Sequence, residues 1–285
     1  VSSPFSCFFS MPNVSTAACS QLWNLRGYQN TPVAACATGT IAVGEAYDAI
    51  RFGRASMLLA GAGESLNSVC AIWNIDVLGA LSRETESPER ASCPFSLQRS
   101  GFVLSEGGAV LCLEERESAL ARGATILAEV TGYANFSDAV DFTSPAEDCV
   151  AREQTIRWAL RGADLQPADL DYINAHGTST PLNDLNETQS LKKALGDEAY
   201  RIPISSTKAY SGHLIAAAGS FETIVCLQAM AAGILPATAH LTQPDPQCDL
   251  DYIAEGHRQG EIHRALNLSF GFGGANAALV LEKHA

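Results

Sequence analysis

The chain has 285 residues, of which 47% are hydrophobic and 17% charged, so it can bury a large core and is not disordered. Its 31 acidic and 18 basic residues give a net charge of −13, which argues against nucleic acid or an anionic membrane surface as the main partner. The nine cysteines are irregularly spaced, so we expect a reducing, cytoplasmic setting without disulfides or structural zinc. No segment predicts a membrane span or a secretory signal.

Short apolar runs alternate along the chain with stretches of helical periodicity, as in an α/β protein whose sheets are covered by helices. We expect strands at residues 31–35, 57–61, 109–113, 126–133, 172–175, 202–206, 266–269 and 277–281. The main expected helices are residues 40–52, 149–162, 185–195 and 214–232.

Cys36 lies where the first predicted strand gives way to a run of small residues that can begin a helix. A thiol at a helix N-terminus meets unpaired N–H groups, so we expect a stabilised thiolate and a nucleophilic side chain. The alternative is a small buried hydrophobic residue, which most cysteines in such a chain are.

Two histidines occupy similar settings further along the chain. His176 follows the strand predicted at 172–175 in a polar, glycine-containing turn, and His213 follows a serine-rich turn that also holds Lys208. His213 directly precedes an apolar helix, whose N-terminus disfavours imidazolium and keeps the ring neutral. Either histidine can instead be structural, and Lys208 can be a solvated surface charge.

A glycine-rich turn at residues 270–276 joins the last two predicted strands. It lacks the lysine and the following helix of a P-loop, and no GxGxxG motif opens a dinucleotide-binding unit. A backbone N–H donor to a thioester-derived oxyanion fits this turn better.

Two internal echoes indicate related halves. Residues 107–114 recur in altered form at 273–282, and Cys36 with its following helix matches Lys208, His213 and the helix through residues 216–219. Because both echoes run in the same order, each half is predicted to present catalytic groups at a junction between a strand and a helix.

These segments, in this order, resemble the β-ketoacyl synthase family, the decarboxylating condensing enzymes of fatty-acid and polyketide synthesis. The resemblance implies an α/β, thiolase-like fold of five layers in αβαβα order with two pseudo-repeated halves. Residues 1–115 would be the incomplete N-terminal half with the nucleophile. Residues 116–285 would be the C-terminal half, with the histidine pair and the glycine-rich turn.

The resemblance also implies the main catalytic roles. Cys36 accepts an acyl chain from a carrier protein, and His176 and His213 then stabilise the enolate formed as a malonyl thioester loses carbon dioxide. The backbone amides of Cys36 and Phe272 form the oxyanion hole, and Phe272 also gates the site.

Supporting roles and partners follow from the same resemblance. Lys208 lies near the histidines and Glu222 supports it, while Thr178 and Thr180 bind the phosphopantetheine arm. No metal, nucleotide or other cofactor is implied, because the substrates are carried on the phosphopantetheine of acyl carrier protein. The family forms dimers, so a homodimer or a ketosynthase-like heterodimer is expected.

The chain departs from the family pattern at two places. Only 35 residues precede Cys36, fewer than is usual, so either another polypeptide supplies the N-terminal segment or the sequence is incomplete. Asn183 stands where glycine is common, which puts the local turn geometry in question.

Three alternatives stay open. A thiolase-type condensing enzyme would carry a second cysteine in residues 270–276, where this chain has none. A non-elongating partner subunit, similar to a chain-length factor, typically replaces the nucleophile, which Cys36 retains. An inactive fragment that only dimerises is the third.

Overall fold

The computed structural model describes residues 11–284 and is built around a five-stranded sheet in the order β3-β9-β8-β4-β5. β8 (Arg264–Gly271) and β9 (Ala275–Glu282) form an antiparallel hairpin. Both are apolar runs buried along nearly their whole length, the composition of strands covered on both faces. The others are β3 (Glu129–Ser137), antiparallel to β9, with β4 (Tyr172–Asn174) and β5 (Ile204–Ser205), which are parallel to each other.

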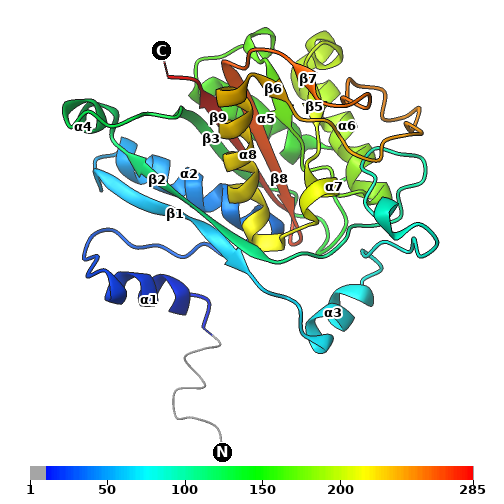
Figure 1. Cartoon of the computed structure of the whole chain (residues 1–285), viewed down its shortest axis with the longest axis horizontal. Coiled ribbons are helices and arrows are strands. Elements are labelled where there is room, and N and C mark those ends of the chain that lie inside the picture. The colour runs from blue at the N-terminus through cyan, green and yellow to red at the C-terminus, as the bar shows by residue number, and fades with distance from the viewer. Residues whose placement is uncertain (1–10, 285) are drawn as a thin grey trace, which may run out of the picture.

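Helices cover both faces of this sheet. α5 (Val150–Gly162) and α6 (Pro181–Leu195) share a core with Leu266 and Val280, whereas α2 (Thr38–Arg51) and α8 (Ala218–Ala232) share one with their neighbours Ala265 and Leu279. Successive residues of a strand point to opposite faces of the sheet, so the two helix pairs lie on opposite sides of it. Figure 1 shows α8 lying along the sheet.

A second, two-stranded sheet lies beyond the central helices. Its strands β1 (Met57–Glu64) and β2 (Gly107–Glu114) are antiparallel and pack on α2 and α8 (Figure 1). On its outer face Leu59 is 56% exposed and Val110 is 60% exposed. The described residues therefore form four layers of the expected five, and no helix layer among them covers this face.

The remaining elements are short. They are α1 (Val14–Leu22), α3 (Val69–Asp76), α4 (Arg116–Ala121), α7 (Lys208–Ser211), β6 (Ile234–Leu235), β7 (Arg258–Gln259), and the 3-10 helices η2 (Ala35–Ala37), η3 (Pro88–Arg90), η4 (Pro167–Asp169), η5 (Gly196–Tyr200) and η6 (Ile215–Ala217). The predicted division at residue 115 falls between β2 and α4, and the two proposed halves, 1–115 and 116–285, stay a prediction.

The two central helices begin in the same way, as the internal echo predicts. η2 leads into α2 and η6 leads into α8, and each begins with a left-handed residue, Ala35 at φ 45° and Ile215 at φ 48°. A Cβ on Gly39 would lie 2.5 Å from the backbone of α8, and one on Gly219 would lie 2.6 Å from the backbone of α2. The helices therefore cross at reciprocal glycines, which fixes the distance between the segments that precede them.

Seven of the eight predicted strands form, but the one expected at residues 31–35 does not. Pro32 has no N–H to donate to a ladder. The Ala34 N–H binds the Thr38 hydroxyl at 2.9 Å, and the Ala34 carbonyl accepts the Ala37 N–H at 3.0 Å. These backbone groups build the tight turn at Cys36 instead of a sheet.

The predicted helices form with shifted starts. The helix expected at 185–195 begins at Pro181, because the Thr180 hydroxyl caps it. The helix expected at 214–232 divides into η6 and α8. Together these residues, Ile215–Ala232, are the one described stretch long and apolar enough for a membrane span, with 56% of it buried inside the protein. Its packing between the two sheets makes it a core helix.

Candidate active site

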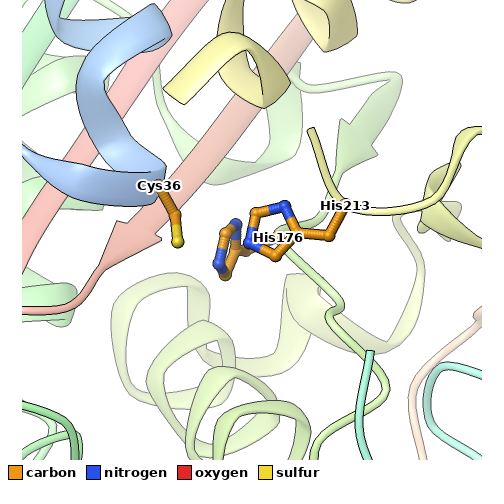
Figure 2. Close-up of side chains that lie close together, drawn as sticks. All are labelled: Cys36, His176 and His213. Atoms are coloured by element: carbon orange, nitrogen blue, oxygen red, sulfur yellow. The ribbon is translucent and has the colours of Figure 1, made fainter. Parts of the chain in front are cut away.

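Cys36 lies in the middle of η2, at the tight turn that leads into α2. The side chain is only 4% exposed and packs with Phe102 and Ile215. The left-handed backbone of Ala35 turns the chain so that this thiol points away from α2 and toward His176 and His213 (Figure 2).

His176 follows β4 directly and is held through its backbone. Its N–H donates to Glu187 of α6 at 2.7 Å, and the Gly177 N–H donates to the other oxygen of that carboxylate at 2.8 Å. One buried carboxylate thus fixes the turn that carries the imidazole.

His213 lies between α7 and η6 and is held on both sides of its ring. Its backbone N–H donates to Val103 at 2.8 Å, and its ring packs edge-on against Phe102 with centroids 5.0 Å apart. The Ile215 N–H donates to Nδ1 at 3.3 Å. Because Nδ1 accepts this hydrogen bond, the neutral ring carries its hydrogen on Nε2.

The structure brings the three predicted side chains together. The sulfur of Cys36 and one ring nitrogen from each of His176 and His213 all lie within 4.8 Å of one another. The two imidazole rings are nearly perpendicular, at 82°, with centroids 5.5 Å apart. Figure 2 shows the three side chains converging from separate elements.

This cluster is compact enough for a metal ion by distance alone, but its donors do not fit one. A metal ion would need the lone pair of Nε2 of His213. Because Nδ1 accepts the Ile215 N–H, the ring hydrogen is on Nε2, and that lone pair is not free. Both Nε2 of His213 and Nδ1 of His176 are buried without a hydrogen-bond partner among the described residues.

The thiol of Cys36 differs from the sequence-based expectation. Burial raises its pKa to about 11, although Lys208 and the backbone N–H groups of Phe272 and Cys36 itself act in the opposite direction. The expected stabilisation at a helix N-terminus is present, but desolvation of the charged form is larger. The prediction of a stabilised thiolate was therefore right about the backbone N–H groups and wrong about the net pKa, which is raised.

Both histidines are neutral, as predicted for His213, but for a different main reason. Burial holds the pKa of His176 and of His213 well below the usual value, and the nearby charge of Lys208 lowers both further. A neutral imidazole can both accept a proton and donate an N–H hydrogen bond, whereas an imidazolium can only donate.

Lys208 and Glu222 form a buried ion pair beside the histidines. The lysine Nζ lies 2.5 Å from Oε1 of Glu222, and each side chain is 1% exposed. Burial raises the pKa of Glu222 and the lysine opposes that rise. The arrangement agrees with the expected support of Lys208 by Glu222.

Phe272 lies in the turn between β8 and β9, next to η2. A Cβ on the preceding Gly271 would lie 2.5 Å from the Ala34 carbonyl oxygen and 3.2 Å from the Cys36 nitrogen. Only glycine allows this close approach. It places the Phe272 N–H at the sulfur of Cys36, where the Cys36 N–H also points.

The two threonines lie together at the start of α6. Their hydroxyl oxygens are 2.9 Å apart, and Thr180 also accepts the Asn183 N–H at 3.3 Å. Asn183 itself is in the first helical turn, where its side chain donates to Asp184 and Glu187. Its replacement of glycine therefore leaves the turn geometry intact.

Sequence reasoning missed Glu187 and Arg152. Burial raises the pKa of Glu187 to about 7, opposed by the two backbone N–H groups and by Arg152. The guanidinium of Arg152 lies 4.1 Å from the centroid of the Phe270 ring, and that ring meets the His176 ring edge-on. The available signal was helical spacing, because Glu187 shares a face of α6 with the apolar residues Leu191 and Ala194.

The two helix-packed sheets and the convergent cysteine and histidines define a thiolase-like fold with one composite site. Two family models match the chain: beta-ketoacyl synthase, N-terminal domain, over residues 2–119, and beta-ketoacyl synthase, C-terminal domain, over residues 127–242. The chain belongs to the β-ketoacyl synthase family, whose members are condensing enzymes.

Relatives of known sequence agree with this assignment. A 3-oxoacyl-[acyl-carrier-protein] synthase 2 from Synechocystis is 41% identical over 282 residues, covering 99% of this chain and 68% of its own length. A putative polyketide beta-ketoacyl synthase 1 from Streptomyces halstedii is 42% identical, covering 95% of this chain and 64% of its own. The chain therefore spans about two thirds of the length of these relatives.

Solved structures confirm the fold. A ketosynthase in complex with its type II polyketide acyl-carrier protein matches with a TM-score of 0.95 and 38% identity, covering 100% of this chain and 70% of its own. A beta-ketoacyl synthase from Burkholderia phymatum matches with a TM-score of 0.92 and 36% identity, covering 96% of this chain and 66% of its own.

Proposed function

We propose that this chain is a β-ketoacyl synthase, an acyltransferase that condenses a carrier-bound acyl chain with a malonyl thioester. The observation that carries the proposal is the convergence of the Cys36 sulfur with neutral ring nitrogens of His176 and His213, all within 4.8 Å. A nucleophile, two groups that accept or donate a proton, and two N–H donors at the sulfur are the parts this condensation needs.

The first half-reaction transfers the acyl chain to Cys36. Because the thiol is protonated at rest, its proton passes to a neutral histidine as the sulfur attacks the thioester carbonyl. The carbonyl oxygen becomes an oxyanion, which the Cys36 and Phe272 N–H groups stabilise. The carrier thiolate leaves and takes up the proton, so the enzyme returns to neutral histidines with an S-acyl bond on Cys36.

The second half-reaction uses the histidines as hydrogen-bond donors. The hydrogen on Nε2 of His213 and an N–H of His176 point at the thioester oxygen of the malonyl group. Carbon dioxide leaves, and its bonding electrons form an enolate that these donors stabilise. The enolate carbon attacks the acyl carbonyl, the C–S bond to Cys36 breaks, and the departing Cys36 thiolate takes up one proton from water.

The proposal extends to substrate delivery. We assign Thr178 and Thr180 to the phosphopantetheine arm, because their hydroxyls lie side by side in the turn that carries His176. The ketosynthase neighbour bound to an acyl-carrier protein supports acyl carrier protein as the partner. A cytoplasmic location, a dimer and an absence of dedicated cofactors complete the proposal.

A non-elongating partner subunit is the second candidate, since a ketosynthase/chain length factor structure matches this chain with a TM-score of 0.88 and 33% identity over 96% of this chain and 65% of its own. The retained Cys36 and its two histidines favour the elongating role. A thiolase-type reaction is disfavoured because residues 270–276 supply no second cysteine.

Intact-protein mass spectrometry tests the proposal. Incubation with acyl-carrier protein should add one acyl group to the peptide that contains Cys36, and Cys36→Ala should remove it. Cys149→Ala, a buried cysteine on another element, is the matched control and should leave the adduct unchanged. His176→Ala and His213→Ala should still form some adduct but release no carbon dioxide from malonyl carrier. Full condensation by Cys36→Ala refutes the proposal.

A further inference from the structure

We propose that Arg152 is a positioning residue for His176, acting through Glu187 and the ring of Phe270. The inference rests on the proposed function, because it assigns the placement of a histidine used in the decarboxylation. Arg152 belongs to α5, a helix outside the catalytic turns.

Arg152 is a buried charge without a direct ion pair. Its side chain is 5% exposed, and Nε and Nη1 have no hydrogen-bond partner among the described residues. Burial accordingly lowers the pKa of its guanidinium, opposed by the charges of Glu187, Asp138, Cys149 and Asp184. A buried charge of this kind lowers the stability of the fold. If Arg152 served only to fill space, an apolar residue of the same length would stabilise the protein more.

The guanidinium lies against Phe270, and its charge acts on Glu187; both of these residues contact His176. It lies over the Phe270 ring at 4.1 Å, a cation–π contact, and that ring meets the His176 ring at 71° with centroids 5.8 Å apart. Its charge also favours the ionised form of Glu187, whose two oxygens accept the His176 and Gly177 N–H groups.

Ionisation of Glu187 decides whether the turn is held. A carboxylate accepts at both oxygens, whereas a carboxylic acid places a hydrogen on one of them and loses that acceptor. The groups facing Glu187 are the cation Arg152, the carboxyl of Asp184, the Tyr252 hydroxyl, the His176 and Gly177 amides, and the Asn183 side chain. Arg152 is the one positive charge among them, so its removal shifts Glu187 toward the acid.

A pH series on the full chain tests this role. In the wild type, decarboxylation of malonyl carrier should fall as pH drops through the pKa of Glu187, about 7. Arg152→Met should move this acidic limb of the pH–rate profile upward by about one pH unit, because a nearby opposite charge shifts a pKa by about 1–3 units. The decarboxylation rate at pH 7 should then fall by about fivefold. Arg152→Lys should return the limb toward its wild-type position.

The controls separate positioning from structure. Arg157→Met removes an exposed arginine from the same helix and should leave the limb in place. Acylation of Cys36 by Arg152→Met should stay at the wild-type level, which shows that the variant is folded. Glu187→Gln should abolish the limb. A limb unmoved in Arg152→Met, or retained in Glu187→Gln, overturns the inference.

A titration that does not depend on turnover distinguishes failure of this inference from failure of the proposed function. The pKa of Glu187 can be followed by ¹³C NMR of labelled glutamate carboxyls, assigned by its absence in Glu187→Gln. A higher pKa in Arg152→Met than in wild type supports the inference even if no carbon dioxide is released. Equal values overturn it even if condensation proceeds.

Discussion

The reactivity of Cys36 toward a small alkylating reagent should rise steeply with pH. The structure raises the pKa of this thiol to about 11 from an ordinary 9.0, because the side chain is buried. At pH 7 the thiolate fraction is then about 10⁻⁴, roughly a hundredfold below that of an exposed thiol, equivalent to about 2.7 kcal/mol. The greater nucleophilicity of a more basic thiolate recovers about tenfold of this loss.

The net expectation is alkylation about tenfold slower at pH 7 than for a free thiol of ordinary pKa, with a rate that rises about tenfold per pH unit up to pH 10. The assay is a short pulse of iodoacetamide at each pH, followed by quantification of the modified Cys36 peptide. Lys208→Met should slow alkylation further, because Lys208 lowers the pKa of Cys36.

A rate that is already level below pH 8 would refute this reasoning. It would mean that the backbone N–H groups and the helix N-terminus outweigh burial, so that the thiol rests as a thiolate. Proton transfer to a histidine would then be unnecessary for the first half-reaction, although the second would be unaffected.

Three further changes probe the scaffold of the site. Lys208→Met should cost about 3–5 kcal/mol in urea unfolding near neutral pH, and Lys208→Met with Glu222→Gln much less, because only the single variant leaves a buried charge unpaired. Removing the lysine raises the already raised pKa of Glu222 further, so this loss should shrink as pH falls toward 4.5; equal losses at pH 5 and pH 8 would contradict it. Gly219→Ala should cost about 1–3 kcal/mol and slow acylation, since its Cβ would meet the Thr40 backbone at 2.6 Å, and an unchanged acylation rate would show that the helix crossing does not set the site. Thr180→Ala should cost about 1 kcal/mol as a lost helix cap, whereas Thr180→Ser should be nearly neutral; equal effects would argue against capping.

The sequence predicts the site where chemistry and local structure coincide. His176 follows a strand and His213 a polar turn, all three catalytic side chains precede a helix, and small residues and glycines mark those junctions. The similarity of the two helix starts is also visible, because Gly39 and Gly219 each follow a run of small residues that begins a helix. These features depend on residues that are close together in the sequence, so one sequence is enough to predict them.

Properties set by distant contacts escape sequence reasoning. The pKa of Cys36 depends on burial by Phe102 and Ile215, far away in the chain, and the local argument gave it the wrong sign. Glu187 looks like an ordinary helical carboxylate until its oxygens are seen on the amides of the His176 turn. The expected strand at residues 31–35 failed for a related reason, since its backbone groups are used at the turn before α2.

The most direct test is a single-turnover chase of the acyl-Cys36 protein with malonyl-carrier protein. The proposed mechanism predicts one equivalent of carbon dioxide and one of 3-oxoacyl carrier for each acyl group lost from Cys36. Loss of the acyl group as free acid, or its retention while malonyl carrier is intact, would contradict a condensing role for this cysteine and its two histidines.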